Sequence, residues 1–75
     1  MIESPSETFR RLYASEINFT VSTFWDSGYQ WALGDELNGY VAKGRTDTFE
    51  QAVAALADAA SAIYPDSEFA RRAAA

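Results

Sequence analysis

The alternation of apolar and polar residues after position 17 constrains the fold of this chain most. Ile17, Phe19 and Val21 lie at alternate positions, Trp25 continues the series after one threonine, and polar residues fill most of the intervening positions. A period of two indicates a β-strand with one buried face. The sequence therefore predicts a half-buried strand over 17–25.

Two turn sequences extend this strand into a meander. Asp26-Ser27-Gly28 fits a three-residue hairpin loop whose glycine is left-handed, and Asn38-Gly39 fits a two-residue hairpin turn. We therefore expect further strands over 29–36 and 40–44. Both turns place the same set of residues on the apolar face: Trp25, Tyr29, Trp31, Leu33, Leu37, Tyr40 and Ala42.

The alternation of apolar and polar residues in the second strand breaks down near its end. It points Asp35 toward the apolar face, so we expect Gly34 to form a bulge or to end the strand. Phe24 and Val41 are exceptions of the opposite kind, because they are apolar residues on the polar face.

A short helix is expected before the sheet, over 4–15. Ser4 is a capping residue, proline follows at the first helical position, and Glu7 would complete a capping box. Phe9, Leu12 and Tyr13 then recur at helical spacing and define one apolar face.

A longer helix is expected after the sheet, over 48–64. Asp47 or Thr48 caps it, and Glu50 or Gln51 closes the capping box. Its apolar stripe consists of Phe49, Val53, Leu56, Ala60 and Ile63.

The chain beyond Pro65 is expected to contribute little. Asp66 or Ser67 would cap one last helical turn that holds Phe69, and residues 71–75 would form a frayed tail. The predicted fold is thus one small α+β domain over 1–75, in the order α-β-β-β-α. Its three-stranded antiparallel meander has the helices packed on one face.

The composition excludes several kinds of chemistry. The 75 residues include no cysteine and no histidine, so ordinary zinc, haem and iron–sulfur sites and catalysis by histidine or thiolate are excluded. Asp35 and Glu36 are the only adjacent carboxylates, and neighbouring strand residues point to opposite faces. We expect no enzyme, no cofactor and no metal site.

The charge favours a protein partner. Residues 12–42 and 46–70 carry nine carboxylates and no basic residue, within a net charge of −5. The order of elements matches that of double-stranded RNA-binding domains, but carboxylates stand at 46–51, where such domains place lysines. We expect a partner with a basic surface, no direct nucleic-acid contact and no membrane contact, although a surface that serves solubility explains the same charge.

The residues expected to bind that partner are an apolar residue on the polar face and six carboxylates at turns and helix starts. They are Phe24, Asp26, Asp35, Glu36, Asp47, Glu50 and Asp58.

Two segments carry a resemblance to known proteins. Residues 25–39 (WDSGYQWALGDELNG) and 64–69 (YPDSEF) resemble short acidic proteins of bacteria and phages. The size, acidity and order of elements are also similar to those of anti-CRISPR proteins that block type I surveillance complexes. The resemblance implies a phage-encoded protein in the cytoplasm of a bacterial host. It also implies binding to a DNA-contacting surface of a Cas subunit, by mimicry of DNA or by steric occlusion.

Two functions are therefore expected as alternatives. The first is an acidic inhibitor that occupies a nucleic-acid site of a bacterial defence complex. The second is an interaction or assembly module that dimerises or docks a host regulator. The protein would be a monomer or a weak dimer in either case.

Overall fold

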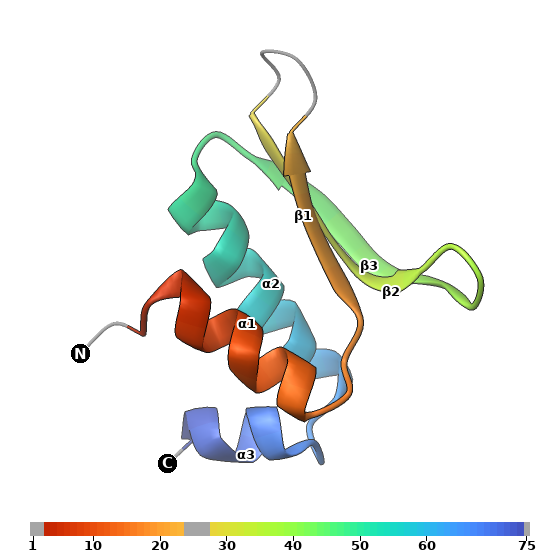
Figure 1. The fold of residues 1–75 in the computed structure, drawn as a ribbon, viewed down its shortest axis with the longest axis vertical. Helices are drawn as coiled ribbons and strands as arrows, with labels where there is room; N and C mark the ends of the chain where they lie inside the picture. Colours follow the sequence, from red (N-terminus) through yellow and green to blue (C-terminus); the bar gives the residue numbers. More distant parts are fainter. Residues whose placement is uncertain (1–2, 24–27, 75) are drawn as a thin grey trace.

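The computed structural model, which describes residues 3–23 and 28–74, consists of two layers (Figure 1). One layer is an antiparallel sheet with the strand order β1-β2-β3, formed by β1 (Phe19–Thr23), β2 (Tyr29–Asp35) and β3 (Gly39–Thr46). The other layer holds α1 (Pro5–Ala14), α2 (Phe49–Ile63) and α3 (Glu68–Ala74). The predicted α+β order is confirmed, with α3 following the second long helix.

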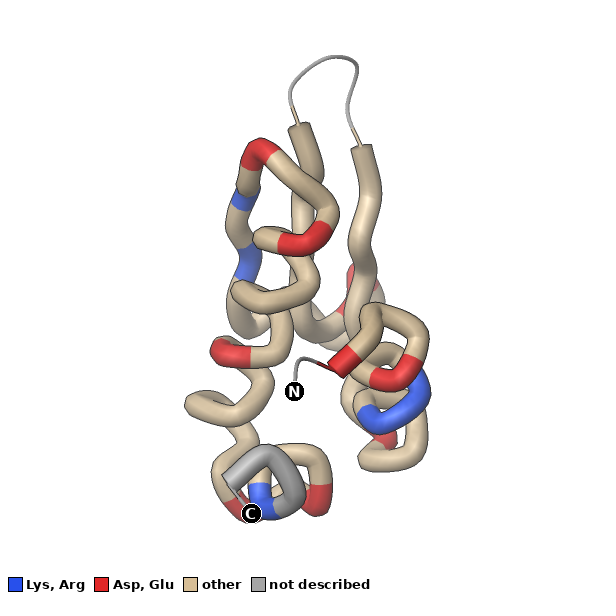
Figure 2. The backbone as a smooth tube through the Cα atoms, turned by 90° about the vertical axis from the view of Figure 1, so that its left-hand side faces the viewer, with Lys and Arg blue, Asp and Glu red and all other residues tan. Residues whose placement is uncertain are grey.

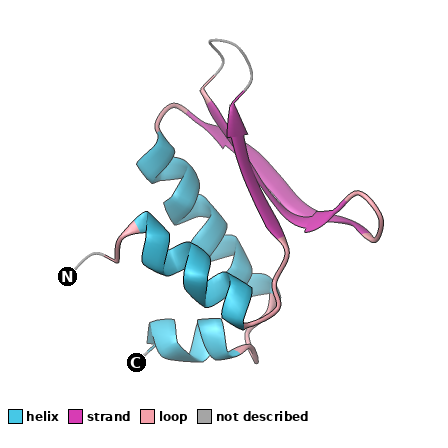
Figure 3. Cartoon of the chain, in the orientation of Figure 1, coloured by secondary structure: helices cyan, strands magenta, loops and turns pink. Residues whose placement is uncertain are grey.

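All three helices lie on the same side of the sheet (Figure 3). The opposite face of the sheet is not covered by any helix of the described chain. This arrangement follows from the alternation in the sequence, since only one face of each strand is apolar enough to pack on a helix.

The core forms where α2 meets the sheet and extends to α1 and α3, which pack on α2. Leu12, Leu33, Leu56 and Phe69 are its largest fully buried side chains, and Trp31 packs against this cluster from β2. Large apolar side chains supply most of the burial energy of a domain of this size.

Aromatic rings join the two layers at the start of α2. The ring of Phe9 stacks on Phe19 at 5.0 Å between centroids and meets the edge of Phe49 at 6.2 Å. Tyr29 lies 5.7 Å from Phe49 on its other side. One ring from each of α1, β1, α2 and β2 thus joins α1 and α2 to the sheet.

The predicted irregularity at Gly34 is a β-bulge. Leu33 pairs with Ala42, but Gly34 pairs with Tyr40, so Val41 is an extra residue on β3. Gly34 has φ 100°, and a Cβ atom there would lie 2.4 Å from the carbonyl oxygen of Gly39. Only glycine fits this backbone without displacement.

The bulge overturns two expectations about side-chain direction. Tyr40 was expected on the apolar face, but the extra residue reverses its parity, and it lies on the uncovered face with 45% of its surface exposed. Leu37 was expected opposite Tyr40 in a two-residue turn. Asp35 instead pairs with Gly39, so Leu37 lies in a three-residue loop and is 91% exposed.

The helix α1 ends in a Schellman motif. The N–H of Ile17 donates to the Leu12 carbonyl at 3.0 Å, and the N–H of Glu16 donates to the Tyr13 carbonyl at 3.0 Å. Glu16 adopts the left-handed conformation that this motif requires, with φ 59°. Tyr13 was expected on the apolar face, but it is 82% exposed, and Thr8 is buried instead.

Both long helices are capped as the sequence predicts. The Ser4 hydroxyl accepts the N–H of Glu7 at 3.3 Å, although the Glu7 carboxylate accepts from the Ser4 hydroxyl and not from its backbone. Thr48 and Gln51 form the complete capping box of α2. In the stripe of α2, Ile63 is the exception to the predicted burial, with 39% of its surface exposed.

The C-terminal segment differs most from expectation. A frayed tail was predicted over 71–75, but the described chain is helical to Ala74. Ser67 caps α3 by accepting the N–H of Ala70 at 3.1 Å. Phe69 is 1% exposed, and its N–H donates to the Ser15 hydroxyl at 3.0 Å. The burial of this one ring anchors α3 on the end of α1.

Candidate functional site

The predicted binding residues fall into two groups at opposite ends of the sheet. Asp35 and Glu36 lie at the β2–β3 hairpin, whereas Asp47 follows β3 at the other end, where Thr46 pairs with Tyr29. The six residue steps from Tyr29 to Asp35 separate the two ends by about 20 Å at ~3.3 Å per residue. Figure 2 shows acidic positions spread over the molecule in the same way. The described carboxylates therefore do not form one continuous array.

Two of the predicted residues, Phe24 and Asp26, lie outside the described residues. Their contribution to a binding surface stays a prediction.

Asp35 is held in place by its neighbours. Its carboxylate accepts the backbone N–H of Asn38 at 2.6 Å, the Asn38 side chain at 3.3 Å and the Asn18 side chain at 2.7 Å. The hydrogen bond from the Asn38 backbone is the main reason why the pKa of Asp35 lies below its usual value of 3.8. Asp35 thus stays ionised at neutral pH and fixes the hairpin loop.

A small cleft adjoins Asp35. It has a volume of about 290 Å³, and Glu16, Asn18, Tyr64 and Ser67 are among its lining residues. A carboxylate that transfers protons near neutral pH needs a raised pKa, but the hydrogen bonds here lower that of Asp35. The environment suits a structural carboxylate.

The acidic residues of α2 are exposed and more closely grouped. Asp47, Glu50 and Asp58 are all exposed, and within the described chain no hydrogen bond or ion pair engages their side chains. Glu50 and Asp58 lie about two helical turns apart, which is ~12 Å along the axis. Between them the helix presents Ala54, a small exposed residue, so a partner could approach this face closely.

Position along α2 separates two roles for these carboxylates. Asp47 and Glu50 lie at the N-terminal end, where negative charge stabilises a helix through its macrodipole. Asp58 lies in the middle of α2 and receives no such benefit. Of these three carboxylates, Asp58 is therefore the one whose charge does not stabilise the helix.

The uncovered face of the sheet is a surface that sequence reasoning missed. A shallow trough of about 500 Å³ crosses it, and Lys43 and Arg45 line this trough from β3. No carboxylate is among the described residues that line it, which are Thr20, Ser22, Gln30, Trp31, Ala32, Tyr40, Lys43, Gly44 and Arg45. The signal was present in the sequence, because Lys43 and Arg45 are two residues apart in a strand.

Among the described residues, no group of three or more histidine, cysteine, aspartate or glutamate side chains could hold a metal ion. None of the described helices is both long and apolar enough to cross a membrane.

Comparisons with protein-family models, with curated proteins and with solved structures found no match. The functional conclusions therefore depend on the geometry and charge of this chain.

Proposed function

We propose that this chain is a small protein-binding inhibitor that acts without catalytic chemistry. Its partner presents a basic, nucleic-acid-binding surface, and a Cas subunit of a bacterial defence complex is the specific candidate. The exposed carboxylates of α2 occupy that surface by mimicry of DNA or by steric occlusion. The protein is phage-encoded and acts in the cytoplasm of the bacterial host.

The observation that carries this proposal is the unpaired acidic face of α2. Glu50 and Asp58 are exposed on α2, Asp47 is exposed just before its N-cap, and α2 contains no basic residue. A fixed array of like charge attracts a surface of opposite charge and raises the rate of association. The hairpin carboxylates support the proposal less, because Asp35 is engaged in hydrogen bonds of the loop.

The test is inhibition of DNA binding by a purified type I surveillance complex. Labelled target DNA is titrated with the complex in the presence of the wild-type protein, Asp58→Lys or Asp66→Lys. Asp66 is the matched control, because it is exposed, lies outside the helices and changes the net charge equally. We expect Asp58→Lys to raise the half-inhibitory concentration about tenfold, and Asp66→Lys to change it less than twofold.

Salt supplies a second readout in the same assay. An electrostatic contact weakens as the Debye length falls from about 10 Å at 0.1 M to 3 Å at 1 M salt. Equal inhibition by wild type and Asp58→Lys would contradict the role of α2. A wild-type protein that leaves DNA binding unchanged would exclude this partner.

The second candidate function is an assembly module. The observation that favours it is the outer edge of β1, with which no other strand of the described chain pairs and whose five residues carry no charge. Charged side chains on edge strands discourage sheet-to-sheet pairing, so an uncharged edge is available to a second copy or a regulator. Sedimentation equilibrium at low and high salt separates the two functions. A concentration-dependent dimer that persists at high salt favours assembly.

A further inference from the structure

We infer that the uncovered face of the sheet and the adjoining free edge of β3 bind an extended acidic polypeptide segment. This surface is distinct from the acidic face of α2, and the inference does not depend on the proposed function. Lys43 and Arg45 carry its charge, and the eight residues of β3 supply its backbone partners.

The charge of this face is opposite to that of the whole molecule. The chain has a net charge of −5, yet the described residues that line the trough include two cations, three hydroxyl groups, one side-chain amide and no carboxylate. Both Lys43 and Arg45 are exposed, and no ion pair engages either of them among residues 3–23 and 28–74. A donor-rich surface with unpaired cations is complementary to carboxylates.

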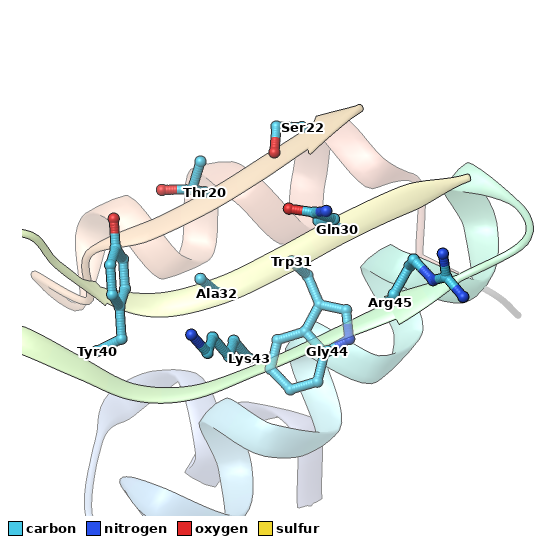
Figure 4. Close-up of a pocket in the computed structure, with 9 residues that line it drawn as sticks. All are labelled: Thr20, Ser22, Gln30, Trp31, Ala32, Tyr40, Lys43, Gly44 and Arg45. Carbon is cyan, nitrogen blue, oxygen red and sulfur yellow. The ribbon is translucent and has the colours of Figure 1, made fainter. Parts of the chain in front are cut away.

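The arrangement of the side chains matches an extended strand. In Figure 4, the helices lie behind the strands, with Gln30 and Ala32 on β2 and Lys43 and Arg45 on β3. Lys43 and Arg45 are two residues apart on one face, which is about 6.6 Å at ~3.3 Å per residue. Carboxylates at alternate positions of an extended peptide have the same spacing. Such a segment places one carboxylate beside each cation.

The free edge of β3 explains why the occupant is a polypeptide. β3 pairs with β2 on one side, and no strand of the described chain pairs with its other side. Its outward N–H and C=O groups can continue the ladder with an added strand, which is a common mode of peptide recognition. A nucleic acid cannot satisfy these groups as a strand does, and two cations make few phosphate contacts on a protein of negative charge.

The same residues disfavour a second copy at this edge. Antiparallel pairing of two β3 strands would bring the Lys43 and Arg45 side chains of both copies together. Like charges on directly opposed strand positions destabilise such pairing. The edge of β3 thus disfavours pairing with a second copy of β3 and favours pairing with an acidic strand.

The test is a titration of the ¹⁵N-labelled full chain with defined peptides, followed by NMR. The probe is a capped heptapeptide of alternating threonine and glutamate. The controls are the alternating threonine–lysine peptide, a peptide of the same composition with adjacent glutamates, and a ten-residue oligothymidylate. For the alternating acidic probe we expect saturable chemical-shift changes with a Kd below about 1 mM. These shifts should be largest at Gln30, Ala32 and Lys43 to Arg45 and absent from α2.

Variants separate this site from general attraction. Lys43→Gln with Arg45→Gln should raise the Kd for the acidic probe at least about tenfold. Arg10→Gln with Arg71→Gln removes the same charge from exposed positions on α1 and α3, and should change the Kd less than twofold. All four positions are exposed, so we expect each variant to fold. An unchanged circular dichroism spectrum is the check.

Several results would overturn the inference. These are no saturable shift at 5 mM acidic probe, and equal binding of the lysine peptide or tighter binding of the oligothymidylate at Gln30, Ala32 and Lys43 to Arg45. A self-association that shifts the β3 residues in the absence of peptide would also overturn it, since a second copy would then be the occupant. Equal Kd values for the two double variants would remove Lys43 and Arg45 from the site.

Discussion

Substitution of Arg11 by methionine should destabilise the protein far more than the same change at its neighbour Arg10. The Arg11 side chain joins three parts of the chain. It contacts the Glu3 carboxylate at 2.6 Å, donates to the Phe69 carbonyl at 2.6 Å and lies 4.2 Å above the Phe69 ring. Arg10 is exposed, and no side-chain contact of this kind engages it in the described part of the chain.

The magnitude follows from the three contacts. The ion pair is only partly shielded, with side chains 22% and 31% exposed, so it contributes about 0.5 kcal/mol. The hydrogen bond to Phe69 contributes about 1–2 kcal/mol, because its loss leaves a partly buried carbonyl without a partner. The cation–π contact adds ~0.5–1 kcal/mol. Methionine keeps the aliphatic stem, so Arg11→Met should lower the free energy of unfolding by about 2–3 kcal/mol.

Urea unfolding followed by far-ultraviolet circular dichroism measures this change. With a slope of ~1 kcal/mol per molar urea for so small a domain, the midpoint should fall by about 2–3 M. Arg10→Met should shift it by less than about 0.5 M. A double-mutant cycle with Glu3→Gln should give a coupling of ~0.5 kcal/mol between Glu3 and Arg11. An equal midpoint for Arg10→Met and Arg11→Met would refute the conclusion that Arg11 secures α3.

Three further predictions concern the turns. Gly34→Ala should lower the free energy of unfolding by about 2–4 kcal/mol, because the new Cβ atom would combine a positive φ with a clash against the Gly39 carbonyl. Gly39→Ala places its Cβ atom in open space and should lower it by only ~1 kcal/mol. Thermal unfolding of the two variants compares these losses. Glu16→Gly should stabilise by ~0.5–1 kcal/mol, because glycine adopts the left-handed conformation freely, and a fall in the melting temperature would contradict this. Because the pKa of Asp35 is lower in the folded state, its contribution is present above about pH 4 and is lost as the pH falls through the folded pKa. The stability difference between wild type and Asp35→Asn should therefore be smaller at pH 3 than at pH 7 in urea titrations.

The sheet and its one-sided packing could be predicted because their signals are local. Parity along a strand and capping residues next to a helix depend on a few neighbouring positions, and Thr48 with Gln51 is an example. The direction of Tyr40 could not be predicted in this way. It depends on which pair of residues ends the ladder between β2 and β3. In the structure this pair is Asp35 with Gly39, and the Asp35 hydrogen bonds that stabilise it exist only in the folded loop.

The full length of α3 could not be predicted because its anchor is remote in sequence. Phe69 is buried against residues of α1, and Arg11 reaches its carbonyl across 58 positions. Local signals predict only one helical turn capped by Asp66 or Ser67, so the residues from position 71 onward read as a tail.

The candidate surfaces could be predicted only in part. The exposure of Glu50 and Asp58 follows from helical spacing, and the structure confirms it. The hairpin carboxylates are separated from those of α2 by the length of β2. Counting charges along the sequence does not show this separation. Sequence reasoning did not single out Lys43 and Arg45, and only the sheet brings them together with Gln30 and Tyr40.

We propose that the two sides of this molecule bind partners of opposite charge. One ¹⁵N NMR experiment tests this directly, in which the full chain is titrated separately with alternating threonine–lysine and threonine–glutamate peptides. We expect the lysine peptide to shift the amides of Asp47, Glu50 and Asp58, and the glutamate peptide to shift those of Lys43 and Arg45. Shifts of the same residues by both peptides, or of neither group by its expected peptide, would contradict it.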